Sequence, residues 1–579
     1  MKHLYISLLI LVAAVAVLFS SCTDGFEKIN TNPYRLTSVD PDYVFGLTTV
    51  ATLKELSNNN NWFFMGNYTN QLSVIGGGGP HFGKDGRGER YWQNFYVYCL
   101  NPLYQFINDP KYNENEGYKN RLMIAKIWRS YVLSQIVALY GPCPCKEACN
   151  GEPNIPYDPE DVVYRFILGE LKEAYETLNP NGDVFPSGAD PFLQSNINRW
   201  AQFAHCIRLR VAMRIAEVPE TLAPGLANEA REIIAEELEN SEQGLLIRDN
   251  KDNFFMRFQT DVDANKNPIS VEVDQYPKRD TEDPGNFPVI HESFLLWIGP
   301  DTYDDPCLNI YATAGSRGTA LNPLPEYLGR PHSMETPQNF IYPPGFSSPY
   351  SNLKYGDFAT LGREFYLVNT SFPFFTYPEL VLMKAEAVLK GYWTGRKTAE
   401  AYYNDGIDAR CARFSISGGP VRQYRETDGI KWSTPSDTIG RQKDFMDYLG
   451  LIDSYLGGPE DNFKRIVVQQ WINFFIQGVD SYTLLRRTGV LTFKPHFGVD
   501  QSTGYTNAYY GYTPFRLGYP GVERVVNAKE TQIAINQYLF DNTHKEPIDQ
   551  ITFKLIFCKD VPIISTPQYY LPDMARNRN

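Results

Sequence analysis

The sequence predicts a mainly α-helical protein in which a scaffold of paired helices carries a large lobe rich in loops. Apolar residues recur at helical spacing in two long stretches, one on each side of the middle of the chain. Between them, residues 277–349 hold 12 of the 40 prolines, which excludes long helices there. Linkers rich in Gly, Ser or charge do not divide the chain, so we expect one large unit over residues 22–579.

The first stretch predicts four helices, at residues 119–140, 160–178, 198–217 and 226–239. The first of these ends at Gly141-Pro142, a strong helix stop. The third places its apolar residues on one face and three arginines off that face, namely Arg208, Arg210 and Arg214. We expect these arginines to form structural ion pairs rather than ligand contacts.

The irregular lobe occupies about residues 277–375, and helices then return at 377–390, 398–413, 463–487 and near 522–540. The best-defined pair lies within residues 376–407. There Ala387, Ala399, Tyr403 and Gly406 fall at offsets 0, 12, 16 and 19, the spacing of a tetratricopeptide helical hairpin. Any tight helical hairpin also places small residues where its helices cross, so the spacing alone leaves both readings open.

The amino terminus carries an export signal. Lys2 and His3 precede an apolar run, residues 4–19, which is too short for a spanning helix and fits a signal-peptide core. The residues Leu-Phe-Ser-Ser before Cys22 resemble a bacterial lipobox, although phenylalanine stands where leucine is usual. We therefore expect removal of residues 1–21 and acylation of Cys22, which anchors the protein to a membrane without a spanning helix. The alternative is ordinary secretion with a chance cysteine.

Composition limits the choice of partners. The net charge of −13 becomes −14 without residues 1–21, because Lys2 is the only fixed charge that is lost. An acidic chain of this kind argues against a nucleic-acid partner. Hydrophobic residues make up 43% of the chain, enough for a large core, and the aromatic share of 14% is high.

Nine cysteines are present, and acylation of Cys22 leaves an even number that allows disulfides in an exported protein. Cys143, Cys145 and Cys149 lie within seven residues. Their spacing is not that of a zinc site and no histidine is near, so we expect a disulfide or free thiols in a turn. The redox state of this turn stays open.

Four segments together resemble the SusD/RagB family of bacterial outer-membrane lipoproteins. They are the Tyr-Pro-Glu-Leu to Asn-Asp-Gly-Ile stretch within 376–407, the Gln-Trp helix ending in Arg-Arg at 466–489, the Arg, Tyr-Pro, Glu and Asn pattern at 514–527, and the Trp-led helix at 199–216. The resemblance implies four tetratricopeptide-like hairpins. It also implies a surface lipoprotein that acts as the lid of a TonB-dependent, SusC-like outer-membrane barrel and captures glycan oligomers, or oligopeptides, for uptake.

Two regions, residues 60–104 and 291–311, combine aromatic rings with polar groups in predicted loops. Sugars offer C–H faces that pack on aromatic rings and hydroxyls that bind planar polar groups. The candidate ligand-binding residues are Trp62, Tyr68, His81, Arg87, Trp92, Trp297, Tyr303 and Tyr311.

Other site chemistries are weakly represented. Asp261, Asp263, Asn265 and Glu272 imitate a calcium loop, but Lys266 stands where such a loop needs glycine; a solvated polar turn is the alternative, and we expect no other cofactor. The chain has neither H-E-x-x-H nor G-x-S-x-G, and we expect the pairs Asp304-Asp305 and Glu160-Asp161 to be ordinary surface acids.

The sequence therefore predicts a non-catalytic binding lipoprotein. The rival from another class is a surface glycoside hydrolase, because two carboxylates at the required separation cannot be recognised in one sequence. A third reading is a purely structural lid, with the cargo contacts supplied by the barrel.

Overall fold

The computed structural model describes the chain in several stretches: residues 41–57, 65–73, 87–241, 243–260, 266–275, 288–300, 303–315, 318–319, 322–323, 326–330, 355–433, 462–491, 515–539 and 554–559. Several predicted features lie outside these residues. They are the signal peptide 1–21, Cys22, Trp62, His81, Asp261, Asp263 and Asn265.

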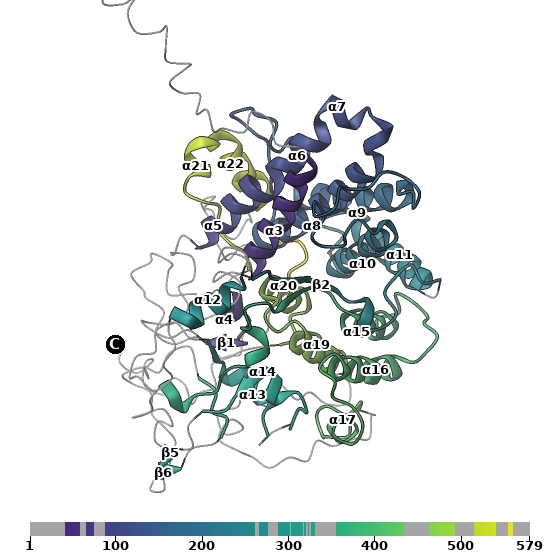
Figure 1. The fold of residues 1–579 in the computed structure, drawn as a ribbon. Coiled ribbons are helices and arrows are strands. Elements are labelled where there is room, and N and C mark those ends of the chain that lie inside the picture. The colour runs from purple at the N-terminus through teal and green to yellow at the C-terminus, as the bar shows by residue number, and fades with distance from the viewer. Residues whose placement is uncertain are drawn as a thin grey trace, which may run out of the picture.

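Successive helices pack against one another as pairs on one side of the molecule (Figure 1). The pairs are α8 (Lys119–Tyr140) with α9 (Glu160–Thr177), α10 (Ile197–Ile215) with α11 (Leu226–Ser241), α15 (Tyr377–Leu389) with α16 (Ala399–Ala412), and α19 (Asn462–Asn473) with α20 (Gly478–Thr488). Further contacts of α9 with α10, and of α15 with α19, join neighbouring pairs. The predicted helices at 119–140, 160–178, 198–217, 226–239, 377–390 and 398–413 are thus confirmed to within two residues.

The α15–α16 hairpin has the close crossing that its small residues predict. Ala387 and Tyr403 are fully buried, and a Cβ atom on Gly406 would lie 2.6 Å from the Leu382 side chain. Gly391 and Gly395 adopt positive φ angles of 71° and 68° in the turn between the helices, a conformation that favours glycine. Thr398 caps α16 by accepting a hydrogen bond from the Ala401 N–H.

The range 463–487 is two helices and not the single helix that periodicity predicted. The chain breaks between α19 and α20, where Ile476 adopts a φ of 64°. The break directs Phe475 into an aromatic cluster, with its ring centroid 4.7 Å from that of Phe294 and 5.2 Å from that of Tyr311. Packing of these rings overrides a helical pattern that contains no proline.

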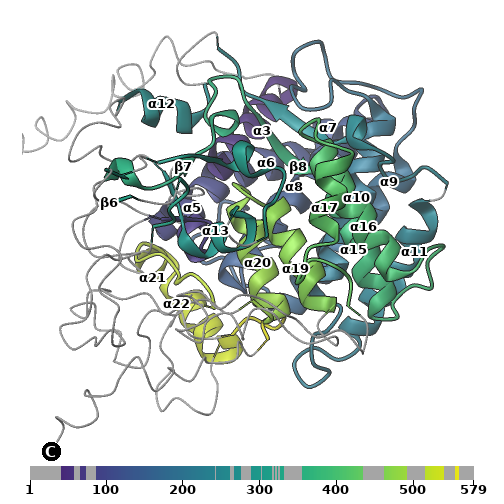
Figure 2. The same cartoon turned by 90° about the horizontal axis from the view of Figure 1, so that it is seen from below.

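The irregular lobe contains only short elements in its described part, as predicted. They are the helices α13 (Glu292–Ile298) and α14 (Leu308–Tyr311), and the strands β3 (Val289–Ile290), β4 (Ala312–Thr313), β5 (Gly318–Thr319), β6 (Asn322–Pro323), β7 (Thr360–Leu361) and β8 (Ser371–Phe375). Helix α12 (Pro268–Gln275) precedes the lobe, and the distant strand β1 (Leu72–Ser73) joins its sheet. This antiparallel sheet joins four strands in the order β1-β3-β7-β4. Figure 2 shows α12, α13, β6 and β7 on the side of the molecule away from α9 and α11.

A third group of helices packs against α8 and closes one end of the scaffold. It contains α3 (Pro41–Ser57), α5 (Arg87–Asn94), the π-helical segment Phe95–Leu100, α6 (Asn101–Asn108) and α7 (Pro110–Asn113). The expectation of a loop over 87–104 was therefore wrong. The segment is helical because Tyr91, Trp92, Phe95 and Leu103 bury their side chains against the scaffold.

Near the C-terminal end the described segments are short: α21 (Glu523–Val526), α22 (Ala528–Ala534) and the π-helical turn Ile535–Leu539. Strand β8 (Ser371–Phe375) pairs antiparallel with β2 (Phe254–Arg257) and leads into α15. One hydrophobic core cluster joins the helix pairs, the third group of helices and the described base of the lobe, from Phe45 to Phe557. Within the described residues, the stretch Glu116–Tyr140 is long and apolar enough to cross a membrane, but 94% of its most apolar window is buried in this core.

Candidate functional site

Five of the predicted ligand-binding residues have described side chains, and all five are packed in the interior. Their exposed fractions are at most 3% for Tyr68, Trp92, Trp297, Tyr303 and Tyr311. Arg87 opens α5 and Glu272 lies in α12. The two regions that hold these residues lie apart in the sequence but meet in the fold, since β1 pairs with β3 and the Gln71 carbonyl accepts from the His291 N–H.

Trp92 sits in a cluster of tyrosines at the end of α8. Its ring centroid lies 4.8 Å from Tyr96, 5.0 Å from Tyr140, 5.5 Å from Tyr519 and 5.8 Å from Tyr157. Two of these tyrosines hold the turn that follows α8 through hydrogen bonds. The Tyr96 hydroxyl donates to the Pro144 carbonyl at 2.7 Å, and the Tyr519 hydroxyl donates to the Pro142 carbonyl at 2.6 Å. Trp92 therefore stabilises a rigid junction in this structure.

The lobe residues form a second aromatic group. Trp297 and Tyr303 stack with their centroids 4.9 Å apart and their planes at 9°. Tyr311 packs edge-on against Phe294 and Phe475, and its hydroxyl lies 3.3 Å from Nη1 of Arg410. His291 caps α13 by accepting from the Ser293 N–H at 3.0 Å. Phe294 also packs on Trp471 of α19, with the ring centroids 5.2 Å apart, so the described base of the lobe is fixed to α16 and α19. A ligand role for Trp297, Tyr303 and Tyr311 stays a prediction.

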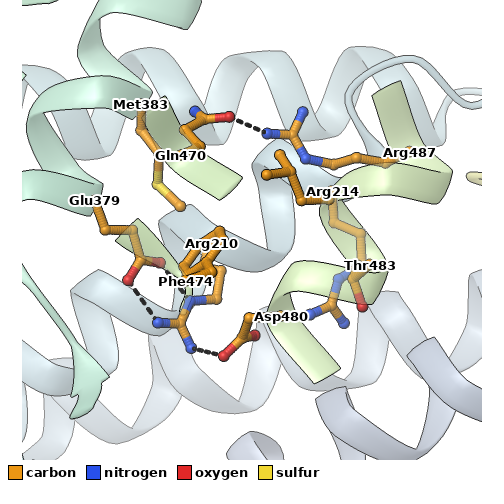
Figure 3. Close-up of a pocket in the computed structure, with 10 residues that line it drawn as sticks. Arg210, Arg214, Glu379, Met383, Gln470, Phe474, Asp480, Thr483 and Arg487 are labelled. Atoms are coloured by element: carbon orange, nitrogen blue, oxygen red, sulfur yellow. Dashed lines mark hydrogen bonds and ion pairs between the residues drawn. The ribbon is translucent and has the colours of Figure 1, made fainter. Parts of the chain in front are cut away.

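A small polar cavity of about 30 Å³ lies between α10, α15, α19 and α20 (Figure 3). Arg210 reaches across it, with Nε and Nη2 at 2.6 and 2.7 Å from the carboxylate of Glu379 and Nη1 at 3.5 Å from Asp480. Arg487 binds Glu386 at 2.6 and 2.8 Å, and Arg214 donates to the Ser134 carbonyl at 2.6 Å. A space of this volume holds one water molecule and excludes a sugar ring.

The arginines of α10 are therefore structural, as their position off the apolar face predicted. Arg208 donates to Glu236 and Glu237 at 2.9 and 2.6 Å, and Arg210 joins α10 to α15 and α20. Burial raises the pKa of Glu379 to about 6 although the Arg210 guanidinium favours its ionised form. The carboxylate and the arginine are both buried, and neither faces open solvent.

Two of the acids that were expected on the surface are buried, and that expectation was wrong for them. Asp305 pairs with Arg410 at 2.6 Å, and neither side chain is exposed. Glu160 opens α9, where both of its carboxylate oxygens lie 3.2–3.3 Å from the Ile556 N–H. Burial raises the pKa of Glu160 to about 8. The burial of Asp305 and Glu160 could not be predicted from their sequence neighbours, because the groups that cover them come from distant segments.

Hydrogen bonds to the Asp158 side chain hold the turn that contains Cys143, Cys145 and Cys149. The backbone N–H groups of Cys145 and Lys146 donate to the Asp158 carboxylate at 3.2 and 2.9 Å. Burial raises the pKa of the Cys149 thiol to about 12 and that of Cys143 and Cys145 still further.

Of the side chains whose positions are described, one group of three candidate metal ligands has its atoms within 4.8 Å of one another: Asp305, Cys307 and Cys411. Their spacing in the sequence could not reveal this group.

Two of the family-like segments, 466–489 and 514–527, meet at the end of α8 and the turn after it. Arg486 donates to the Ala138 carbonyl at 2.6 Å, and Arg516 donates to that of Tyr140 at 3.0 Å. These bonds satisfy carbonyls that have no partner within the helix. Glu523 accepts from the Tyr157 hydroxyl at 2.9 Å, and Asn527 binds both backbone polar groups of Ile155. The residues that carry the resemblance thus assemble the scaffold.

Comparisons with known proteins agree with this architecture. A family model described as "Starch-binding associating with outer membrane" matches residues 46–520. The comparison with curated protein sequences found no match.

Solved structures share the fold over most of the chain. A SusD homologue from Bacteroides uniformis is 19% identical, with a TM-score of 0.65 over 90% of this chain and 100% of that one. A homologue from Bacteroides ovatus is 20% identical, with a TM-score of 0.65 over 90% and 100%. A chitin-binding SusD homologue from Flavobacterium johnsoniae is 17% identical, with a TM-score of 0.62 over 90% and 98%.

The tetratricopeptide-like helical scaffold is thereby confirmed. With the family model matching most of its length, the chain belongs to the SusD-like family.

Proposed function

We propose that this protein is a cell-surface lipoprotein that binds glycan oligomers and acts as the lid of a TonB-dependent, SusC-like outer-membrane barrel. The observation that carries the proposal is the family match over residues 46–520, whose description combines starch binding with the outer membrane. Chitin binding by a neighbour of the same fold agrees with a glycan as cargo.

The anchor and the partner follow from physical needs. An acylated Cys22 holds the protein at the membrane, but an anchored globular protein cannot carry cargo across a bilayer. A closed barrel can, because it satisfies its own backbone hydrogen bonds within lipid. The lid therefore binds cargo outside, and the barrel transports it.

Exposed apolar side chains support a docking surface on the α3 end of the scaffold. Tyr43 and Leu47 lie one turn apart on α3 and are 52% and 67% exposed. Val97 and Tyr98 lie on the neighbouring π-helical segment and are 54% and 59% exposed. Large apolar groups gathered on adjacent elements are typical of protein interfaces, so we place the barrel contact here.

One titration series distinguishes a binding protein from a glycoside hydrolase. The mature chain with Cys22→Ser is titrated calorimetrically with starch-derived and chitin-derived oligosaccharides and with a mixture of oligopeptides, while reducing ends are assayed in parallel. We expect heat of binding with an oligosaccharide and no release of reducing ends. Binding of oligopeptides, with no binding of either oligosaccharide, would show that the cargo is peptide and not glycan. Release of reducing sugar that is lost on changing one carboxylate would establish the hydrolase instead.

A further inference from the structure

Two cysteines far apart in the sequence meet where the lobe contacts the scaffold. Cys307 immediately precedes α14 in the lobe, and Cys411 lies in the last turn of α16. Their sulfur atoms and a carboxylate oxygen of Asp305 all lie within 4.8 Å of one another, and the two thiols are hydrogen-bonded. Both cysteines are completely buried.

The contacts of Asp305 hold the two cysteines side by side independently of their thiol groups. Arg410 precedes Cys411, and its Nη2 lies 2.6 Å from Oδ2 of Asp305. Oδ1 of Asp305 accepts from the backbone N–H of Cys307 at 2.8 Å. One fully buried ion pair therefore sets the position of both cysteine backbones.

We propose that Cys307 and Cys411 form a disulfide bond that fixes the loop-rich lobe to helix α16 in the exported protein. The inference rests on the proposed function in one respect, since it takes from it the oxidising side of the membrane, where disulfides form and persist. The eight cysteines other than Cys22 are an even number, which accommodates this pair.

A metal ion fits this cluster poorly. Structural zinc sites use four ligands, and the described residues bring three together here. Both oxygens of Asp305 already accept hydrogen bonds from Arg410. The guanidinium is always charged and would repel a cation beside it.

The chemistry is a two-step thiol–disulfide exchange with a disulfide oxidoreductase. The Cys411 sulfur attacks one sulfur of the oxidant's disulfide, and the oxidant's other sulfur leaves as a thiolate. The Cys307 sulfur then attacks Sγ of Cys411, which forms the new bond and releases the second sulfur of the oxidant. Two electrons pass to the oxidant, and the two protons lost by the cysteines convert it to a dithiol.

Cys411 suits the attacking role. The hydrogen bond from Cys307 and the charge of Arg410 lower its pKa against the opposing effect of burial, and the thiolate is the reactive form. The exchange takes place late in folding, when Cys307 and Arg410 already lie beside Cys411 and the oxidant can still reach the sulfurs. Complete burial then shields the bond in the folded protein, so that a reductant reaches it when the protein unfolds on heating.

The direct test maps the bond in protein purified from outer membranes after free thiols are blocked with N-ethylmaleimide in denaturant, which exposes buried thiols to the reagent. Trypsin releases Cys307 in the peptide 280–317 and Cys411 in the tripeptide Cys-Ala-Arg at 411–413. We expect these two peptides joined and lighter by two hydrogen atoms. Both peptides carrying maleimide, or one zinc ion per chain that is lost in Cys307→Ser, would overturn the inference.

A second measurement separates the bond from the packing of the cysteines. A reductant should lower the Tm of the wild type but not that of the double variant Cys307→Ser/Cys411→Ser. The matched control is Cys206→Ser, which removes an equally buried thiol on α10 and should keep the full effect of the reductant. If the reductant left the Tm of the wild type unchanged, the proposed disulfide between Cys307 and Cys411 would be contradicted.

Failure of the inference differs from failure of the proposed function. Protein at the cell surface with both thiols free overturns the disulfide alone. Protein found in the cytoplasm overturns the proposed function, and refolding in a buffer of reduced and oxidised glutathione then decides the pairing. A joined peptide in that buffer supports the geometry, and its absence rejects it.

Discussion

Buried arginines connect segments that are far apart in the chain. Arg486 and Arg516 bind the last carbonyls of α8, and Arg487 pairs with Glu386 of α15. Each guanidinium offers five donors in a planar fork, so one side chain can satisfy several buried acceptors at once. At the scale of single residues, the arginines that carry the family resemblance are therefore residues that join the helices to one another.

Replacement of Arg210 by methionine should destabilise the protein strongly. It leaves Glu379 and Asp480 buried without their cation, and loss of one partner of a buried pair costs about 3–5 kcal/mol. The free energy of unfolding from urea titration at pH 7 gives the change. The control is Arg165→Met, which removes a half-exposed arginine paired with Glu229 and Asp161 and should cost no more than about 1 kcal/mol. Equal losses in the two variants would contradict the structural role of Arg210.

Glu160 should make stability fall as pH rises. Its carboxyl group has a pKa of about 8 in the folded protein against an ordinary value of 4.5, so the unfolded chain releases the proton first. The stability that the neutral group contributes is present below pH 4.5 and is lost between pH 4.5 and 8, at up to about 1.4 kcal/mol per pH unit. Glu160→Gln cannot ionise, and its unfolding free energy should fall less over this range than that of the wild type.

Glu217 offers the control of opposite sign. Burial opposes its ionisation, but Lys390, Tyr392 and Lys559 outweigh burial and lower its pKa to about 2. Its contribution is present above pH 4.5 and is lost as pH falls toward 2. Glu217→Gln should therefore flatten the acid side of the stability curve and leave the slope between pH 5 and 8 unchanged. The same flattening above pH 5 in both variants would refute the assignment to Glu160.

At the scale of elements, the α15–α16 hairpin depends on the absence of a side chain at Gly406. Gly406→Ala brings a Cβ atom to 2.6 Å from Leu382, which is fully buried and has little room to move. We expect a loss of about 1–3 kcal/mol in unfolding free energy, the usual effect of overpacking.

Gly169→Ala in α9 is the matched control. No atom lies within 4 Å of a Cβ built there, so the change should stabilise the protein by up to about 1 kcal/mol through helix propensity alone. Chemical denaturation of the two variants side by side measures both effects. A Gly406→Ala variant as stable as Gly169→Ala would show that the crossing is looser than the structure indicates.

Periodicity predicted helices well where one face is apolar throughout, as in α8, α9, α10 and α11. It failed where tertiary packing decides. The break at Ile476 lets the ring of Phe475 pack on that of Phe294, and the ring of Trp92 in helix α5 packs on tyrosines from elsewhere in the chain, Tyr140 and Tyr519. Neither set of partners is visible within a local window of sequence.

The candidate site was predictable only as a region. Aromatic residues beside polar ones mark both a sugar-binding face and a packed junction, and linear sequence does not distinguish them. Tyr303 lies next to Asp304 in the sequence, yet its ring stacks on that of Trp297 in the interior. The Asp305–Arg410 pair was missed because its members are separated by more than a hundred residues.

At the scale of the whole molecule, a rigid helical scaffold supports a lobe attached through buried contacts. The aromatic cluster around Phe475 and the Asp305–Arg410 pair fix the described base of the lobe to α16 and α19. Loops on such a frame are a common place for binding residues, because the scaffold holds them without itself changing.

The proposed barrel contact predicts a specific loss of the complex. Leu47→Asp places a charge in the exposed apolar surface of α3, and a charge buried without a partner weakens an interface. We expect several-fold less barrel to co-purify with this variant at equal expression. The control, Leu222→Asp, alters a residue that is 59% exposed in the connection between α10 and α11 and should leave recovery unchanged. Equal recovery with both variants would move the contact elsewhere.

The central claim is that the protein binds glycan as the partner of a transport barrel. Gentle purification from detergent-solubilised outer membranes, with mass spectrometry of the co-purifying proteins and small molecules, tests it most directly. The account predicts a TonB-dependent barrel and an oligosaccharide in the same complex, with an acyl group on Cys22. Recovery of an acylated protein alone, with neither barrel nor glycan, would contradict it.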